Sequence, residues 1–79
     1  MPVVHISVPE GSLTQEQKQR IIAGVTDVLV EVEGIPQVRA GTFVLVNDVP
    51  DGGWGIAGKA WTLADLAARF GAKAPGADG

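Results

Sequence analysis

Pro2 is the residue of this chain with the most unusual chemical potential. Proline is small enough for the initiator Met1 to be removed, which would leave Pro2 as an N-terminal secondary amine. An ordinary α-amino group has a pKa of about 7.7–8.0, and burial in an apolar pocket lowers the pKa of an amine further. A desolvated Pro2 amine could therefore act as a general base near neutral pH.

The sequence offers few other nucleophiles or metal ligands. It contains no cysteine and one histidine, His5, which excludes thiolate chemistry and argues against a metal centre. A triad of His5 with Ser7 or Ser12 is disfavoured because all three lie in the first twelve residues. We therefore expect His5 to be a structural or interface residue, and we expect no metal and no cofactor.

A glycine-rich segment, residues 52–59 (GGWGIAGK), matches two phosphate-binding patterns. A dinucleotide site would require it to follow the first strand of its unit, and a P-loop would require Ser or Thr where Ala60 follows Lys59. Neither requirement is met. The segment instead predicts a tight hairpin that carries Trp54 on a closely approaching backbone.

The elements that would position these residues follow from apolar periodicity. Residues 3–8 predict a strand ended by Pro9, with one buried face, and residues 42–46 predict a second strand buried on both faces. A helix between them should begin at a capping box of Thr14 and Gln17 and run to about residue 33, where Gly34 ends it. Its core stripe is predicted to be Ile21, Ile22, Val25, Val28, Leu29 and Val32, and the first strand's buried face Val4, Ile6 and Val8.

This order predicts an α+β fold with a β-α-β unit of parallel strands. Residues 49–59 are rich in turn formers, and residues 62–70 predict a short C-terminal helix capped by Thr62 and Asp65. We expect residues 1–79 to form one domain with a flexible tail at 72–79.

Composition limits the partners. The chain has 79 residues, of which 46% are hydrophobic, more than so small a domain can bury alone, so we expect a homo-oligomer. The net charge is −3 and the basic residues are scattered, which argues against nucleic acid. The apolar runs are too short for a bilayer and no signal peptide is evident, so a cytoplasmic location away from membranes is expected.

The whole pattern resembles the 4-oxalocrotonate tautomerase family over nearly all of residues 2–60. The resemblance is carried by Pro2, the short first strand, the Glu10-Gly11 turn, the helix start at 16–18 and the loop at 54–58. It implies a β-α-β subunit whose two-stranded sheets pair into dimers, usually within a hexamer. It also implies that Pro2 shuttles a proton during keto-enol tautomerisation of a small carboxylate substrate.

The sequence departs from the family at two arginines that bind the substrate carboxylate and the developing oxyanion. Their positions hold Ser12 or Leu13 and Phe43. Losing a charged donor at an oxyanion can cost about 2.7–4 kcal/mol. We therefore expect a substrate with less negative charge than the usual dicarboxylate.

The resemblance also suggests substrate-binding residues. Trp54 takes the place of the family's pocket aromatic, where it would line an apolar wall or pack in an oligomer interface. Phe43 and Ile56 are also predicted to contact the substrate. Arg39, just before the second strand, is the first candidate for a replacement cation; Lys59 and Arg20 are the others. Trp61 is predicted to be a core or interface residue.

Two other functions stay open from the sequence. Protonated Pro2 could act as an acid in hydration, dehalogenation or decarboxylation of a three-carbon acid, with Asp48 or Asp51 activating water. Alternatively, the chain could be a non-catalytic oligomeric scaffold that kept the fold.

Overall fold

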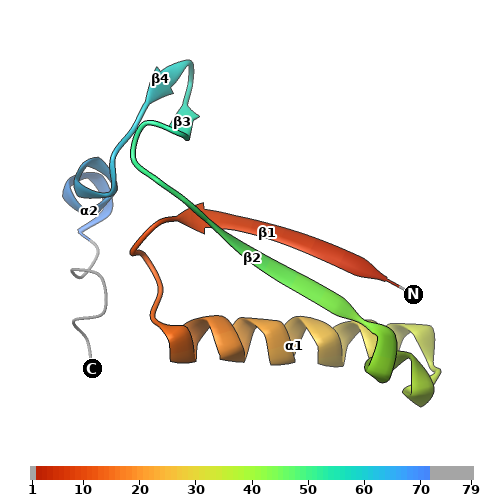
Figure 1. Cartoon of the computed structure of the whole chain (residues 1–79). Coiled ribbons are helices and arrows are strands. Elements are labelled where there is room, and N and C mark those ends of the chain that lie inside the picture. Colours follow the sequence, from red (N-terminus) through yellow and green to blue (C-terminus); the bar gives the residue numbers. More distant parts are fainter. Residues whose placement is uncertain (1, 72–79) are drawn as a thin grey trace. The chain divides into compact units, whose positions relative to one another are not determined.

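The computed structural model of the chain describes residues 2–71 (Figure 1). Met1 and the predicted flexible tail, 72–79, lie outside the described residues. The elements follow in the order β1 (Val3–Pro9), α1 (Gln15–Glu33), the 3₁₀ helix η1 (Pro36–Gly41), β2 (Phe43–Val49), β3 (Gly55–Ile56), β4 (Lys59–Ala60) and α2 (Leu63–Phe70). The predicted α+β fold, with two strands flanking the long helix, is confirmed.

The described residues divide into two compact units. The first contains residues 2–6 and 15–47, and the second contains residues 7–14 and 48–71. Strands β1 and β2 are neighbours in one sheet. At one end the Phe43 amide donates to the Pro2 carbonyl at 3.0 Å, and at the other the Glu10 amide donates to the Val49 carbonyl at 2.7 Å. The N-terminal end of β1 therefore lies beside the N-terminal end of β2, and their C-terminal ends are also neighbours. The two strands are parallel, as the β-α-β prediction requires.

The first unit has an apolar face that the chain itself leaves uncovered. Figure 1 shows α1 along one side of the strand pair. Residues of the first unit on the opposite side, Val3, His5, Phe43, Leu45 and Asn47, are exposed. The prediction that the second strand is buried on both faces is therefore wrong for a single chain, because only one of its faces has a layer to pack against.

Helix α1 ends where predicted, at Gly34, which has φ of +74° and donates to the Val30 carbonyl at 2.9 Å. The predicted apolar stripe, however, is only partly covered: Val28 is 57% and Val32 is 78% exposed. Two strands about 4.8 Å apart are too narrow to cover the wide apolar face of a helix. Between α1 and β2 the chain forms η1, which the sequence analysis did not predict.

The second unit contains the predicted hairpin and the predicted short helix. Strands β3 and β4 are antiparallel, with Gly55 opposite Ala60 and Ile56 opposite Lys59. Both turn residues, Ala57 at φ 53° and Gly58 at φ 83°, have the positive φ that a two-residue type I′ turn needs. The backbones approach so closely that a Cβ on Gly55 would lie 2.2 Å from the Lys59 carbonyl oxygen.

Helix α2 begins at the predicted capping box. The Asp65 amide donates to the Thr62 hydroxyl at 3.1 Å, and the Thr62 amide donates to the Asp65 carboxylate at 2.9 Å. Within residues 2–71, neither helix combines the length and the apolar character needed to cross a membrane.

Candidate functional site

Pro2 lies directly before β1 and is half-buried. Its carbonyl oxygen accepts the 3.0 Å hydrogen bond from the amide of Phe43, the first residue of β2. The sequence alone placed these two residues 41 positions apart, and the parallel pairing brings their backbones into contact. The Phe43 side chain is 61% exposed, so it supplies apolar surface beside the N-terminal end of the sheet.

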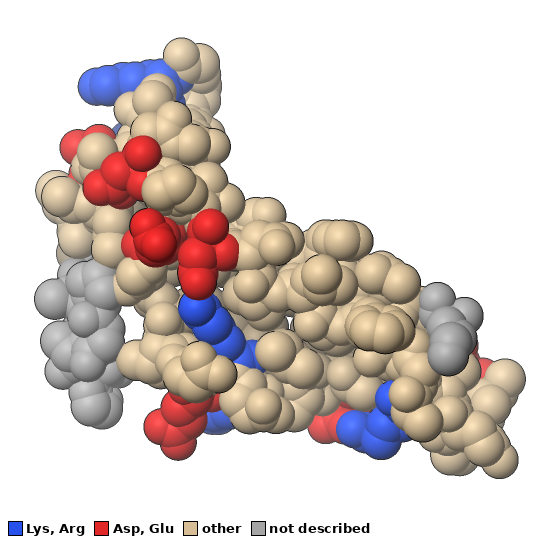
Figure 2. All heavy atoms as spheres, in the orientation of Figure 1, with Lys and Arg blue, Asp and Glu red and all other residues tan. Residues whose placement is uncertain are grey.

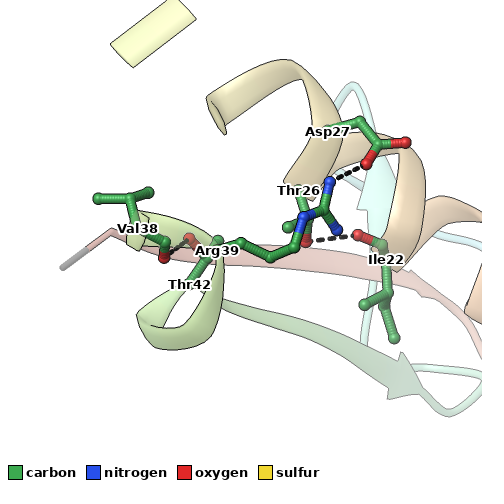
Figure 3. Close-up of polar contacts among 6 residues, drawn as sticks. All are labelled: Ile22, Thr26, Asp27, Val38, Arg39 and Thr42. Atoms are coloured by element: carbon green, nitrogen blue, oxygen red, sulfur yellow. Dashed lines mark hydrogen bonds and ion pairs between the residues drawn. The ribbon is translucent and has the colours of Figure 1, made fainter. Parts of the chain in front are cut away.

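Arg39, the first candidate for a replacement cation, has a partner in the chain. Figure 3 shows its side chain reaching from η1 to α1, where the guanidinium donates to the Asp27 carboxylate. The two side chains are 54% and 65% exposed, and exposed ion pairs of this kind contribute about 0–1 kcal/mol. The pair therefore holds Arg39 against α1 only weakly, and a role for Arg39 in substrate binding stays a prediction.

One face of the β3–β4 hairpin carries its large side chains. The register continues beyond the two strands, because the Trp61 amide donates to the Trp54 carbonyl at 3.0 Å. Residues directly opposite one another on antiparallel strands, and residues two apart on one strand, project from the same face. Trp54, Ile56, Lys59 and Trp61 thus share a face, whereas Gly55 and Ala60 occupy the other.

An aromatic cluster supports Trp54 on this face. The rings of Trp54 and Trp61 lie 6.2 Å apart, at 43°, within the range of favourable aromatic pairs. The Arg69 guanidinium lies over the Trp61 ring at 6.0 Å. The sequence analysis did not anticipate this role for Arg69, which lies in the last turn of α2. Trp61 therefore helps hold the candidate pocket aromatic in place.

A shallow hollow of about 380 Å³ lies against the hairpin. Its lining includes the half-buried Trp54 and the exposed Lys59 together with glycine and alanine backbone: Gly52, Gly53, Trp54, Gly55, Gly58, Lys59 and Ala60. The Trp54 indole nitrogen is itself covered and has no hydrogen-bond partner within residues 2–71. The hollow combines an aromatic surface, a flexible cation and a backbone with little side-chain bulk.

The predicted site residues fall in both compact units. Pro2, Arg39 and Phe43 belong to the first unit, and Trp54 and Ile56 belong to the second. Ile56 is 45% exposed and is not among the residues that line the hollow.

Two residues at positions of functional interest have local structural roles. The Ser12 hydroxyl donates to the Pro9 carbonyl at 2.6 Å, which closes the turn after β1. The Asp51 carboxylate accepts the Leu63 amide at 2.8 Å, which satisfies a free amide at the beginning of α2. Among residues 2–71, no three or more His, Cys, Asp or Glu side chains gather into a group that could hold a metal ion.

Known proteins are similar to this chain in sequence and in fold. Residues 2–64 match the family model described as tautomerase enzyme. The chain is 45% identical over 58 residues to the 2-hydroxymuconate tautomerase of Comamonas testosteroni, covering 73% of this chain and 87% of that protein. It is 40% identical over 62 residues to "Probable tautomerase K2" of Dickeya dadantii, covering 78% of this chain and 90% of that protein.

The fold agrees with these sequence matches. A solved 4-oxalocrotonate tautomerase isozyme from Methylibium petroleiphilum superposes with a TM-score of 0.67 and 35% identity, covering 82% of this chain and 97% of that one. Similarity in fold and similarity in sequence thus both extend over most of the chain. The chain therefore belongs to the tautomerase family and is an isomerase of the 4-oxalocrotonate tautomerase type.

Proposed function

We propose that this tautomerase interconverts the enol and keto forms of a small 2-hydroxydienoate or enolpyruvate-type acid, with Pro2 as the proton carrier after Met1 is removed. The observation that supports it best is the position of Pro2, half-buried directly before β1 with its carbonyl bonded to the first residue of β2. This hydrogen bond holds the Pro2 carbonyl against β2 and so keeps the nitrogen near the N-terminal end of the strand pair, and a proton carrier needs such positioning.

The reaction needs one group to move one proton. In the ketonisation direction the Pro2 nitrogen takes the proton of the enol hydroxyl, the C=C electrons shift, and the protonated amine returns the proton to carbon. Substrate and product are isomers, so no oxidant, reductant or second substrate is required. Phe43 of the first unit and Trp54 and Ile56 of the second are each proposed as apolar contacts of the substrate. Arg39 is proposed as a cation that can exchange its weak bond to Asp27 for a substrate oxygen.

The substrate is proposed to be a monocarboxylate. The two positions at which the family's arginines are expected hold Phe43 and the turn-closing Ser12 or its neighbour Leu13, and none of these carries charge. A second carboxylate of a bound substrate would lose water without gaining a cation as a partner. That loss raises the free energy of binding. The cytoplasmic location also stays a prediction.

The function is tested by following enol ketonisation through ultraviolet absorbance. With protein shown by mass to lack Met1, we expect phenylenolpyruvate to be converted with kcat/KM at least about tenfold higher than 2-hydroxymuconate, since one uncompensated charged contact is worth about 1.4 kcal/mol or more. Equal or greater efficiency with 2-hydroxymuconate would contradict the monocarboxylate proposal, and no turnover of either enol would contradict the substrate class.

The active form is proposed to be a homo-oligomer, with a hexamer favoured over a dimer or trimer. No apolar residue is buried within residues 2–71 of one chain, and large apolar side chains are exposed on both the sheet and α1. A second uncovered surface is the apolar groove of about 560 Å³ between β1 and α1, lined by Val4, Ile21, Gly24, Val25, Val28 and Leu29. Association of copies would remove this apolar area from water.

Leu45, on the uncovered face of β2, provides the test of assembly. Leu45→Lys is expected to shift the protein toward smaller species in light scattering and to lower the Tm, because a charge would be buried between copies. Leu45→Met keeps the apolar volume and should retain the wild-type mass. An unchanged mass and Tm for Leu45→Lys would show that this face is not an interface.

A further inference from the structure

We infer that Lys59, on the hairpin beside Trp54, binds the substrate carboxylate and so sets the preference for a single negative charge. This inference rests on the proposed function, because it concerns how the same substrate is held. It assigns the charged contact to a residue outside the two positions at which the family's arginines are expected.

The register of the hairpin places Lys59 on the required face. Lys59 lies directly opposite Ile56 and diagonally across from Trp54, whose carbonyl continues the ladder to Trp61. Diagonal neighbours on one face lie roughly 7–8 Å apart at Cα, within reach of long side chains. A small planar conjugated acid that spans this separation can therefore lie on the Trp54 ring with its carboxylate at the Lys59 ammonium group. Trp54 and Lys59 are also both among the residues that line the hollow, together with Gly55 and Ala60 of the other face.

The backbone of the hairpin holds this arrangement in place. Gly55 approaches the Lys59 carbonyl too closely for any side chain, and the type I′ turn fixes the number of residues between the strands. A slip of one residue would move Lys59 to the opposite face, away from Trp54. The glycines that match nucleotide-binding patterns thus have a different use, which is to set the register of Lys59 against Trp54.

Lys59 is also more available than Arg39. Within residues 2–71, Lys59 makes no ion pair and is exposed, whereas the Arg39 guanidinium is bonded to Asp27. Figure 2 shows a positively charged group projecting from the surface over the β3–β4 hairpin, and Lys59 is the basic residue of those strands. A carboxylate can reach Lys59 without first displacing an internal partner.

The charges of the second unit explain why one carboxylate is favoured. Its acidic side chains, Glu10, Asp48, Asp51 and Asp65, outnumber its basic side chains, Lys59 and Arg69. Lys59 can neutralise one anionic group of a bound acid, while a second would meet a net negative field. The inferred ligand is therefore a monoanionic, planar 2-oxo or 2-hydroxy acid with an apolar substituent.

The test separates charge recognition from catalysis by using ligands that cannot tautomerise. Calorimetry measures the binding of cinnamate, a planar monocarboxylate, and of its uncharged amide, cinnamamide. The proteins compared are wild type, Lys59→Gln, Lys59→Arg, Arg39→Gln and, as the control, Gln19→Glu. Lys59→Gln should weaken cinnamate binding by roughly tenfold, the scale of a lost charge-assisted hydrogen bond, and leave cinnamamide binding within about twofold. Lys59→Arg should retain most of the cinnamate affinity. Gln19→Glu, at an exposed position of α1, makes the net charge more negative by one unit, as Lys59→Gln does, and should leave cinnamate binding within about twofold of wild type.

The kinetic arm uses phenylenolpyruvate ketonisation. Lys59→Gln should raise KM by roughly tenfold with a smaller change in kcat, because Lys59 contacts the carboxylate and not the moving proton. Unchanged cinnamate affinity in Lys59→Gln, equal losses for cinnamate and cinnamamide, or a loss that appears in Arg39→Gln instead would overturn the inference. Lys59-dependent cinnamate binding without any enol turnover would support the anion site while refuting the proposed function.

Discussion

Adding one residue ahead of Pro2 is expected to lower kcat/KM for enol ketonisation by about 10²–10⁴-fold, the contribution of a general acid-base group. The Pro2 nitrogen would then be part of a peptide bond, with no basic lone pair to receive the enol proton. Pro2→Ala keeps a terminal amine but loses the ring that restricts it, and it should lose activity by a smaller factor. The measurement is ketonisation of phenylenolpyruvate by proteins whose N-termini are verified by mass.

The control for this prediction is structural integrity. The hydrogen bond at this site uses the Pro2 carbonyl, which both variants keep, so the bond to the Phe43 amide should survive. Far-ultraviolet circular dichroism and the light-scattering mass should match wild type. If the extended protein is as active as the processed one, Pro2 is not the proton carrier and another group must perform the transfer.

Gly55→Ala is expected to destabilise the protein by about 1–3 kcal/mol and to raise KM sharply. The new methyl group would lie 2.2 Å from the Lys59 carbonyl oxygen, a backbone atom that can move only if β3 and β4 separate. Separation would displace Trp54 and Lys59 together. Thermal unfolding should show a Tm lowered by roughly 5–20 °C, since each kcal/mol shifts the Tm of a domain this size by about 4–8 °C.

Ala57→Gly is the matched control within the same hairpin. Ala57 has φ of 53°, where an L side chain is strained, so glycine should fit the turn at no cost or with a gain of up to about 1 kcal/mol. Activity should stay close to wild type. A wild-type Tm and KM for Gly55→Ala would mean that the close approach of the two backbones does not hold the site.

Much of this molecule follows from local sequence. The alternation of residues 3–8 determines β1, the spacing of apolar residues determines α1, and Gly34 ends that helix because it can adopt positive φ. The Thr62 and Asp65 capping box places the start of α2. These features depend on interactions between residues within a few positions of one another, so a short segment of sequence is enough to predict them. The same local chemistry identifies Pro2 as a possible N-terminal amine.

Other features depend on contacts between distant segments. Whether the second face of β2 is covered depends on how many layers one chain can supply, and the structure leaves Phe43 and Leu45 exposed. The bond of Arg39 to Asp27 and the use of Asp51 at the beginning of α2 each join residues 12 positions apart. No periodicity in the sequence specifies such partners.

The position of Lys59 depends partly on local sequence and partly on strand pairing. The glycines predict a turn, but the face on which Lys59 lies depends on the pairing register, because a shift of one residue reverses every side chain. The structure shows that Ile56 lies opposite Lys59 and that the rings of Trp54 and Trp61 meet on that face at a tilt of 43°. The sequence thus determined which chemical groups the chain has, and the pairing of its strands determined which of them can act together.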